Sequence, residues 1–209
     1  MNVTLIIKCG YQDSFYFISQ IASIEKVDRL EVYRDEPSLP HKKVVYKSPK
    51  SKVFYHFRHA VRMIDILIIS HRQKPDLIVG IYEIPHGLIA ALAGMFLGIP
   101  SVVSIIGNPA YKKVRHGLRL LITMWVLKLT SAITVTGATS KKYLESKGLS
   151  PEKIFILPNT IELGNFRYIN TDERIYDIIS LGVLRAEKRV ETVVNVVLEI
   201  KKSYAHVKV

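Results

Sequence analysis

The sequence predicts an α/β protein built on a parallel sheet with helices on both of its faces. Three observations lead to this prediction. Short apolar segments of strand length alternate with longer segments whose apolar residues recur at helical spacing. The strand segments are apolar along nearly their whole length, as in DLIVGIY at 76–82, which is typical of strands buried on both faces. Glycine and proline separate the segments, as at Gly98–Pro100.

The first half of the chain supplies four predicted strands and three predicted helices. The strands are Val3–Cys9, Arg29–Tyr33, Lys43–Lys47 and Asp76–Tyr82, and the helices are Ser14–Ile24, Tyr55–Gln73 and His86–Leu97. The longest of these helices places Ala60, Val61, Ile64, Leu67 and Ile68 on one face, which we expect to be the buried face. Lys74 and Pro75 end it, because the residue before a proline disfavours helix.

The second half continues the alternation. The predicted strands are Ser101–Ile106, Ala132–Thr136, Lys153–Leu157 and Tyr176–Leu181, and the helices are Val114–Leu129, Thr139–Lys147 and Lys188–Lys202. Gly148 closes the second of these helices. The uncharged run Gly87–Gly107 is long enough to span a membrane. Gly98 and Pro100 interrupt it, so a buried helix, a turn and a buried strand are the preferred interpretation.

Composition excludes several classes of protein. A hydrophobic content of 48% over 209 residues is enough for a sizeable core. Cys9 is the only cysteine, so there is no disulfide framework, and no Cys/His cluster has the spacing of a metal site. No secretory signal precedes the first strand, so we expect a cytoplasmic protein. The net charge of +12 favours an anionic partner, which is nucleic acid, anionic lipid or a phosphorylated small molecule.

Ligands of parallel α/β sheets bind beyond the carboxyl ends of the strands. The residues that follow the predicted central strands are therefore binding candidates: Glu83, His86, Gly87, Gly107 and Asn108. Each has a structural alternative, since His86 can cap a helix and Asn108-Pro109 reads as a turn.

The last predicted strand leads into a glycine turn and a basic helix start, a common arrangement for binding phosphate. Gly182, Arg185 and Lys188 are the candidate residues there. The alternative is a solvated helix start.

Basic residues also precede the apolar helical segment 118–129, which contains Trp125. They are Lys112, Lys113, Arg115 and Arg119, and a basic stretch joined to an apolar helix can dock on an anionic membrane surface. The alternative is that the apolar residues of this helix belong to the core. The basic run Lys42–Lys52 is interleaved with aromatic residues, but no nucleic-acid-binding motif accompanies it, so we expect no nucleic-acid partner.

Four segments in this order resemble GT-B-fold glycosyltransferases of family 4. KGLSPEKIFILPNTIELGNF at 147–166 is similar to the end of that family's N-terminal domain, and IISLGVLRAEKRV at 178–190 is similar to the start of its C-terminal domain. Segments 76–108 and 132–144 resemble two earlier parts of the N-terminal domain. The resemblance implies a Rossmann-like N-terminal acceptor domain at 1–165 and an incomplete start of the nucleotide-sugar-binding domain at 166–209.

The resemblance also implies a function. Family members are retaining enzymes that move a sugar from a nucleotide-diphosphate-sugar donor to a hydroxyl acceptor, here a glycan or a lipid-linked acceptor, without a cofactor or metal ion. Lys188 matches the family's diphosphate-binding lysine, and the region of Glu83 and His86 matches its acceptor side. The family's Glu-x7-Glu motif would lie beyond Val209, so the catalytic residues are unknown and this chain alone is expected to be inactive. Thr160 and Val183 stand where the family often has glycine and arginine.

Two alternatives remain open. The first is a non-catalytic truncated or split homologue that binds an acceptor, a peripheral membrane site or a partner chain. The second is another GT-B enzyme, such as a nucleotide-sugar 2-epimerase. A dinucleotide oxidoreductase is disfavoured, since no G-x-G-x-x-G follows a strand. An incomplete second domain would expose apolar residues over Tyr176–Leu198, which predicts association or partial disorder of this segment. The partner would be a second copy of the chain or a missing C-terminal half.

Overall fold

The computed structural model describes residues 1–34, 36, 40–48, 58–109, 117–159, 175–182, 184 and 188–208. The chain divides into two compact units, Met1–Ile161 and Glu162–Val209. The boundary predicted at 165/166 lies outside the described residues. Each unit is considered by itself below.

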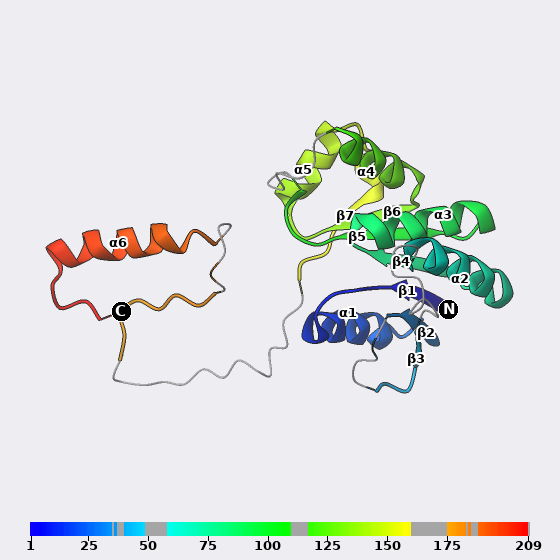
Figure 1. Ribbon diagram of the computed structural model, residues 1–209, viewed down its shortest axis with the longest axis horizontal. Helices are drawn as coiled ribbons and strands as arrows, with labels where there is room; N and C mark the ends of the chain where they lie inside the picture. Colours follow the sequence, from blue (N-terminus) through cyan, green and yellow to red (C-terminus); the bar gives the residue numbers. More distant parts are fainter. Residues whose placement is uncertain are drawn as a thin grey trace. The chain divides into compact units, whose positions relative to one another are not determined.

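The first unit contains a seven-stranded sheet in which every pair of neighbours is parallel, in the order β3-β2-β1-β4-β5-β6-β7 (Figure 1). The strands are β1 (Asn2–Ile6), β2 (Arg29–Tyr33), β3 (Val44–Lys47), β4 (Leu77–Ile81), β5 (Ser101–Ile105), β6 (Ala132–Val135) and β7 (Ile154–Ile156). The predicted α/β parallel-sheet class is therefore confirmed.

The alternation of side chains along each strand assigns the helices to the two faces of the sheet. The helices are α1 (Tyr11–Ser23), α2 (Arg58–Gln73), α3 (Leu88–Leu97), α4 (Leu118–Leu129) and α5 (Ala138–Ser146). Leu5 and Ile7 pack with Ile18 of α1. Ile6 points the other way and packs with Ile66 of α2. Among the described helices, α1 covers one face, and α2 to α5 cover the other.

Most predicted elements of the first unit form within a few residues of their expected ends. The range of β2 is the predicted one, and the run at 87–107 is a helix, a left-handed turn at Gly98 (φ +67°) and β5, as expected. Residues 55–57 and 114–116 of two predicted helices lie outside the described residues. In the part of the chain that the structure describes, no helix is both long and apolar enough to cross a bilayer.

The predicted buried face of α2 is wrong. The exposed fractions of Ile64 and Ile68 are 52% and 46%, whereas Arg62, Ile66 and Ser70 are buried. This helix carries apolar residues on more than one side, so helical spacing alone does not identify the side that meets the sheet. The sheet selects the stripe of Arg62, Ile66 and Ser70, which recurs every four residues.

The predicted strand at Tyr176–Leu181 is also wrong. The segment is irregular, and Leu181 is fully exposed. A strand needs a neighbour to receive its backbone hydrogen bonds. The amides of Asp177 and Ile178 instead both donate to the carbonyl of Lys208, at 2.9 and 3.2 Å. The second unit also contains α6 (Val190–Ser203), none of whose residues is buried, so the expected exposure of apolar side chains over 176–198 is observed.

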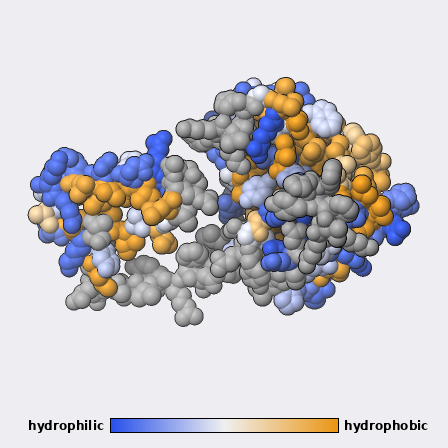
Figure 2. Space-filling model, in the orientation of Figure 1, coloured by the Kyte–Doolittle hydropathy of each residue, from blue (hydrophilic) through white to orange (hydrophobic). Residues whose placement is uncertain are grey.

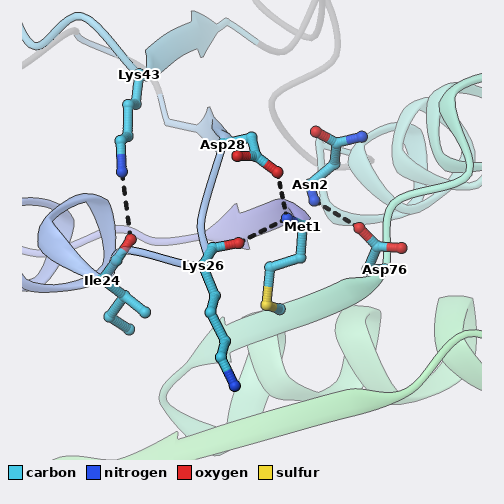
Figure 3. Close-up of polar contacts among 7 residues, drawn as sticks. All are labelled: Met1, Asn2, Ile24, Lys26, Asp28, Lys43 and Asp76. Atoms are coloured by element: carbon cyan, nitrogen blue, oxygen red, sulfur yellow. Dashed lines mark hydrogen bonds and ion pairs between the residues drawn. The ribbon is translucent and has the colours of Figure 1, made fainter.

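The amino end of β1 is held by polar contacts with neighbouring segments on both sides (Figure 3). The Met1 ammonium donates to Asp28 Oδ2 at 2.5 Å and to the Lys26 carbonyl at 2.6 Å. The Asn2 amide donates to Asp76 Oδ2 at 2.6 Å. The hydrogen bond and charge of the ammonium lower the pKa of the Asp28 carboxyl. These contacts tie the amino end of β1 to the residues that directly precede β2 and β4.

The face of the sheet that carries α1 is only partly covered. A groove of about 440 Å³ runs beside α1, between Phe17 and Ile21 of this helix, Ile24 just after it, and the strands β4 to β6. Val102, Ser104 and Thr134 form part of its floor.

The turn at Glu83–Gly87, which follows β4, comes very close to this strand at Gly80. A Cβ added at Gly80 would lie 2.6 Å from the carbonyl oxygen of His86, which is a backbone atom and cannot rotate away as a side chain could. We expect Gly80→Ala to lower the free energy of unfolding by roughly 1–3 kcal/mol. Urea denaturation measures this as a lower midpoint at an unchanged slope.

Gly137→Ala is the matched control, since a Cβ there meets nothing within 4 Å and its φ of −172° suits any residue. We expect a change of no more than about 0.5 kcal/mol. Equal effects of the two substitutions would contradict the close approach at Gly80.

Candidate functional site

The strand order of the first unit reverses between β1 and β4. The chain builds outward from β1 through β2 to β3, and then returns to place β4 on the other side of β1. Beyond the carboxyl ends of such a strand pair, no crossover connection covers the sheet edge, which is why ligands of this architecture bind there. The segments that follow β1, β4 and β5 meet at this carboxyl edge, and they contain the residues that the sequence singled out.

The turn that follows β4 is tightly built. Tyr82 adopts φ +69°, an unfavourable value for a residue with a side chain, and its amide donates to the Ser104 carbonyl of β5 at 2.9 Å. The Tyr82 carbonyl accepts from the Gly87 amide at 2.8 Å, which closes the wide turn η2 (Glu83–Gly87). A Cβ at Gly87 would lie 2.7 Å from this same carbonyl oxygen. Gly87 is therefore required for the turn to close.

This turn buries two of the predicted site residues, Glu83 and His86, whose exposed fractions are 6% and 3%. His86 Nδ1 lies 3.0 Å from the carbonyl oxygen of Ile81, and Nε2 lies 3.3 Å from Nη1 of Arg62. A carbonyl only accepts and a guanidinium only donates, so the proton must be on Nδ1 and the lone pair on Nε2. His86 is then a neutral ring that links β4 to α2.

The surroundings keep this ring neutral. Burial is the largest cause that lowers the pKa of His86, to about 4, and the charges of Arg62, His59 and Lys8 act in the same direction. The hydrogen bond with the Ile81 carbonyl opposes them. A direct contact between His86 and a ligand stays a prediction. The geometry instead favours a positioning role, in which His86 orients Arg62.

Sequence reasoning missed Arg62, which is buried in the middle of α2's inner face and bonded to His86. The sequence pattern that could have indicated it is the spacing of Arg62, Ile66 and Ser70, which recur every four residues and so share one side of the helix. Arg34 is buried directly after β2, and Lys8 is exposed shortly after β1. With Arg62 they place three basic side chains near the carboxyl ends of β1, β2 and β4, at the same edge as the buried carboxylate of Glu83.

Gly107 and Asn108 follow β5 at the same edge and are partly exposed. The expectation that a side chain at position 107 would crowd the site is not supported, since a Cβ there would meet nothing within 4 Å. Gly107 is instead required by its backbone, which adopts φ +86°. Asn108 is the residue of this pair whose side chain lies at the edge and is partly exposed.

The predicted phosphate residues lie in the second unit. Gly182 and Lys188 line the same hollow of about 350 Å³, together with apolar residues of α6 such as Val193 and Val197. Lys188 is exposed and precedes the helix by two residues.

Arg185 lies outside the described residues, as do Lys112, Lys113 and Arg115 of the predicted membrane patch. Arg119 of that patch is exposed on the first turn of α4. No group of three or more His, Cys, Asp or Glu in the described residues is placed to hold a metal ion.

The neutral state of His86 makes the stability of the fold depend on pH. The pKa is about 4 in the folded chain, against 6.5 for an ordinary histidine. Between these values the unfolded chain binds a proton that the folded chain rejects, so stability is full above pH 6.5 and falls as the pH falls toward 4. We expect a loss of up to roughly 3 kcal/mol across this window, measured by urea denaturation.

His86→Gln is the matched variant, because it keeps a polar side chain that does not titrate. It should be less stable than the parent chain at pH 7 and should lose less stability between pH 6.5 and pH 5. The same slope in both chains would show that His86 is not the group responsible. Asp28 does not disturb this window, since its pKa is lowered from an ordinary value of 3.8.

Comparisons with known proteins bear on the family and the fold of the chain. A family model described as a glycosyl transferase 4-like domain matches residues 2–160. Among curated proteins, none has a sequence that matches this chain.

Several solved structures share the fold. A UDP-GlcNAc 2-epimerase from Methanocaldococcus jannaschii superimposes with a TM-score of 0.57 at 18% identity, over 76% of this chain and 46% of that one. The lipopolysaccharide outer core galactosyltransferase WaaB gives 0.58 at 13% identity, over 78% and 47%. The Anabaena protein HepE also gives 0.58 at 13% identity, over 78% and 45%.

At these identities the solved structures show the fold alone. This chain spans less than half the length of each of the three. The family model covers well over half of this chain, and the seven-stranded parallel sheet that it matches has the Rossmann-like GT-B architecture of those structures. The chain therefore belongs to the glycosyl transferase 4-like family.

Proposed function

We propose that the protein takes part in transferring a sugar from a nucleotide-diphosphate-sugar donor to a hydroxyl of a glycan or a lipid-linked acceptor. One observation carries the proposal. In a domain of the glycosyl transferase 4-like family, the carboxyl edge at the β1/β4 switch point gathers a buried carboxylate, Glu83, and a buried, oriented arginine, Arg62. Such an edge can bind a polar acceptor through both hydrogen-bond acceptors and donors.

The donor would be held by the second unit. When the bond from the sugar to the diphosphate breaks, negative charge develops on the leaving oxygen, and a fixed cation there lowers the barrier. Lys188 and the backbone amides at the start of α6 supply positive charge, and Gly182 lets the diphosphate approach the backbone. Arg185 is proposed as a second cation by its position in sequence. Structural neighbours with bound UDP-GlcNAc and UDP support a uridine nucleotide as the first probe.

An epimerase is the second candidate function, because several neighbours are UDP-GlcNAc 2-epimerases. The two candidates differ in one property that the chain itself can reveal. A glycosyltransferase has a separate acceptor, whereas an epimerase acts on the sugar of the nucleotide that it already holds. Binding of a free saccharide at the carboxyl edge of the first unit therefore favours transfer.

The binding test uses backbone amide NMR on the whole chain. We expect UDP to shift the amides of Gly182 and Lys188, and saccharides from a panel of candidate acceptors to shift those of Gly10, Gly107 and Asn108. Lys188→Ala should weaken UDP binding by at least about fivefold, because it removes a charge-assisted contact. Asn108→Ala should weaken saccharide binding and leave UDP binding unchanged.

Lys201→Ala is the matched control, since Lys201 lies in the last turn of the same helix. Equal losses in Lys188→Ala and Lys201→Ala would reduce the effect to net charge and contradict the donor site. Binding of UDP-GlcNAc with no response to any saccharide would favour the epimerase candidate. The absence of any shift at millimolar ligand would leave neither function supported for this chain.

A further inference from the structure

A small cavity lies at the amino end of the sheet, at the opposite end of the strands from the candidate functional site. Its volume is about 150 Å³, and its lining includes Asn2 and Thr4 of β1, Arg29 and Glu31 of β2, and Gln73 and Pro75 at the end of α2. Asn2, Arg29 and Gln73 are exposed, so the cavity is reached from solvent. In Figure 2 the end of α2 forms a hydrophilic patch at the right of the first unit.

Glu31 contributes a buried carboxylate to this cavity. Leu30 and Val32 pack with α1, whereas Tyr33 packs with α2, so Glu31, two residues before Tyr33, also points toward α2. Its exposed fraction is 5%. One carboxylate oxygen, Oε1, accepts from both Nε and Nη2 of Arg29, at 3.1 and 2.7 Å. The other oxygen, Oε2, is buried and has no hydrogen-bond partner in the part of the chain that the structure describes.

The other groups around the cavity are mostly hydrogen-bond acceptors. They include the hydroxyl of the buried Thr4 and the side-chain amide oxygens of Asn2 and Gln73. The last carbonyls of α2 have no partner within the helix and give this end a partial negative charge. The carboxylate of Asp76, which accepts from the Asn2 amide, lies at the same end of the sheet (Figure 3). A buried carboxylate oxygen without a donor is costly, so these surroundings favour a ligand that donates hydrogen bonds.

A primary ammonium group has the chemistry that these acceptors need. It carries one positive charge and three N–H donors, so one N–H can bond Glu31 Oε2 while the others meet neutral oxygens such as that of Thr4. A water molecule takes up about 30 Å³ in the liquid, so a cavity of about 150 Å³ also has room for a short aliphatic stem against Val3 and Pro75. Divalent cations are less suited, because they favour several carboxylates, and the described residues gather no group of three acidic, His or Cys side chains.

We propose that this cavity binds a small primary amine, whose ammonium group donates to Glu31 Oε2. The bound amine would join β1, β2 and the end of α2, and would therefore stabilise the first unit. Arg29, and the exposed Arg72 and Lys74 near the end of α2, oppose a cation, so we expect a dissociation constant in the millimolar range. The proposal is independent of the proposed function, because the carboxyl edge of the sheet stays free.

Titration of the whole chain with ethylammonium chloride tests the proposal, followed by backbone amide NMR at pH 7 and constant ionic strength. We expect saturable shifts at the amides of Thr4 and Glu31 and none at Asn108. Ethanol has nearly the same shape without the charge, and potassium ion has the charge without N–H donors. Both should give much smaller shifts at the same concentration. Ethylammonium should also raise the urea midpoint of unfolding.

Glu31→Gln removes the charge and keeps an oxygen for Arg29, so it should weaken ethylammonium binding by about tenfold. Thr4→Val keeps the shape of the side chain and removes one acceptor, so it should weaken binding by about threefold. This second variant carries the test if Glu31→Gln fails to fold, which circular dichroism reveals.

Glu25→Gln is the matched control, since Glu25 is exposed just after α1 and does not line the cavity. It changes the net charge by the same amount as Glu31→Gln and should leave binding unchanged. Equal losses in the two variants would reduce the effect to net charge and overturn the proposal. Potassium shifts as large as those of ethylammonium would make this a site for alkali ions instead. The absence of any shift at 100 mM ethylammonium, roughly ten times the weakest dissociation constant expected, would show that the cavity holds water only.

Discussion

The pairing of β1 on both of its edges is the constraint on which the rest of the first unit depends. β1 is the first strand of the chain and lies in the middle of the sheet, parallel to β2 on one side and to β4 on the other. A right-handed connection to each side puts α1 on one face and the later helices on the opposite face. The same geometry leaves the carboxyl edge between β1 and β4 open. The position of the candidate site thus follows from the strand order, before any polar side chain is considered.

The chemical properties of this edge depend on polar side chains that are buried there, above all His86 and Arg62. His86 and Arg62 come from segments 24 residues apart in sequence and meet at 3.3 Å. The interior disfavours a second positive charge beside the guanidinium, so the histidine gives up its proton and offers a lone pair. The lone pair of His86 thereby accepts from Nη1 of Arg62 and helps to fix the direction of the guanidinium at the carboxyl edge. The closeness of the turn to β4, enforced at Gly80 and Gly87, holds the ring in this place.

The sequence predicted the elements of the first unit well because the strands are buried on both faces and the breaks between elements are marked by glycine and proline. Arg29–Tyr33 and the helix–turn–strand at 88–105 are examples. It failed where the answer depends on contacts that are distant in sequence. α2 has several apolar sides, and only the sheet decides that Ile66 rather than Ile64 is buried. Tyr176–Leu181 has the composition of a strand but no neighbour in the described part of its unit. Of the site, sequence order predicted the edge, whereas the pairing of Arg62 with His86 could only come from the fold.

The groove beside α1 has a consequence for how this sequence can change. On β5 and β6 the residues that point toward α2 to α5, such as Val103 and Ile133, are fully buried and apolar. The residues that point toward the groove include Ser104 and Thr134, whose hydroxyls occupy positions that the strand pattern would otherwise fill with hydrocarbon. The two faces of the sheet therefore accept different side chains at positions that are adjacent in sequence. Polar side chains are accommodated at 104 and 134, which line the groove, whereas a polar side chain at 103 or 133 would be enclosed on every side by hydrocarbon.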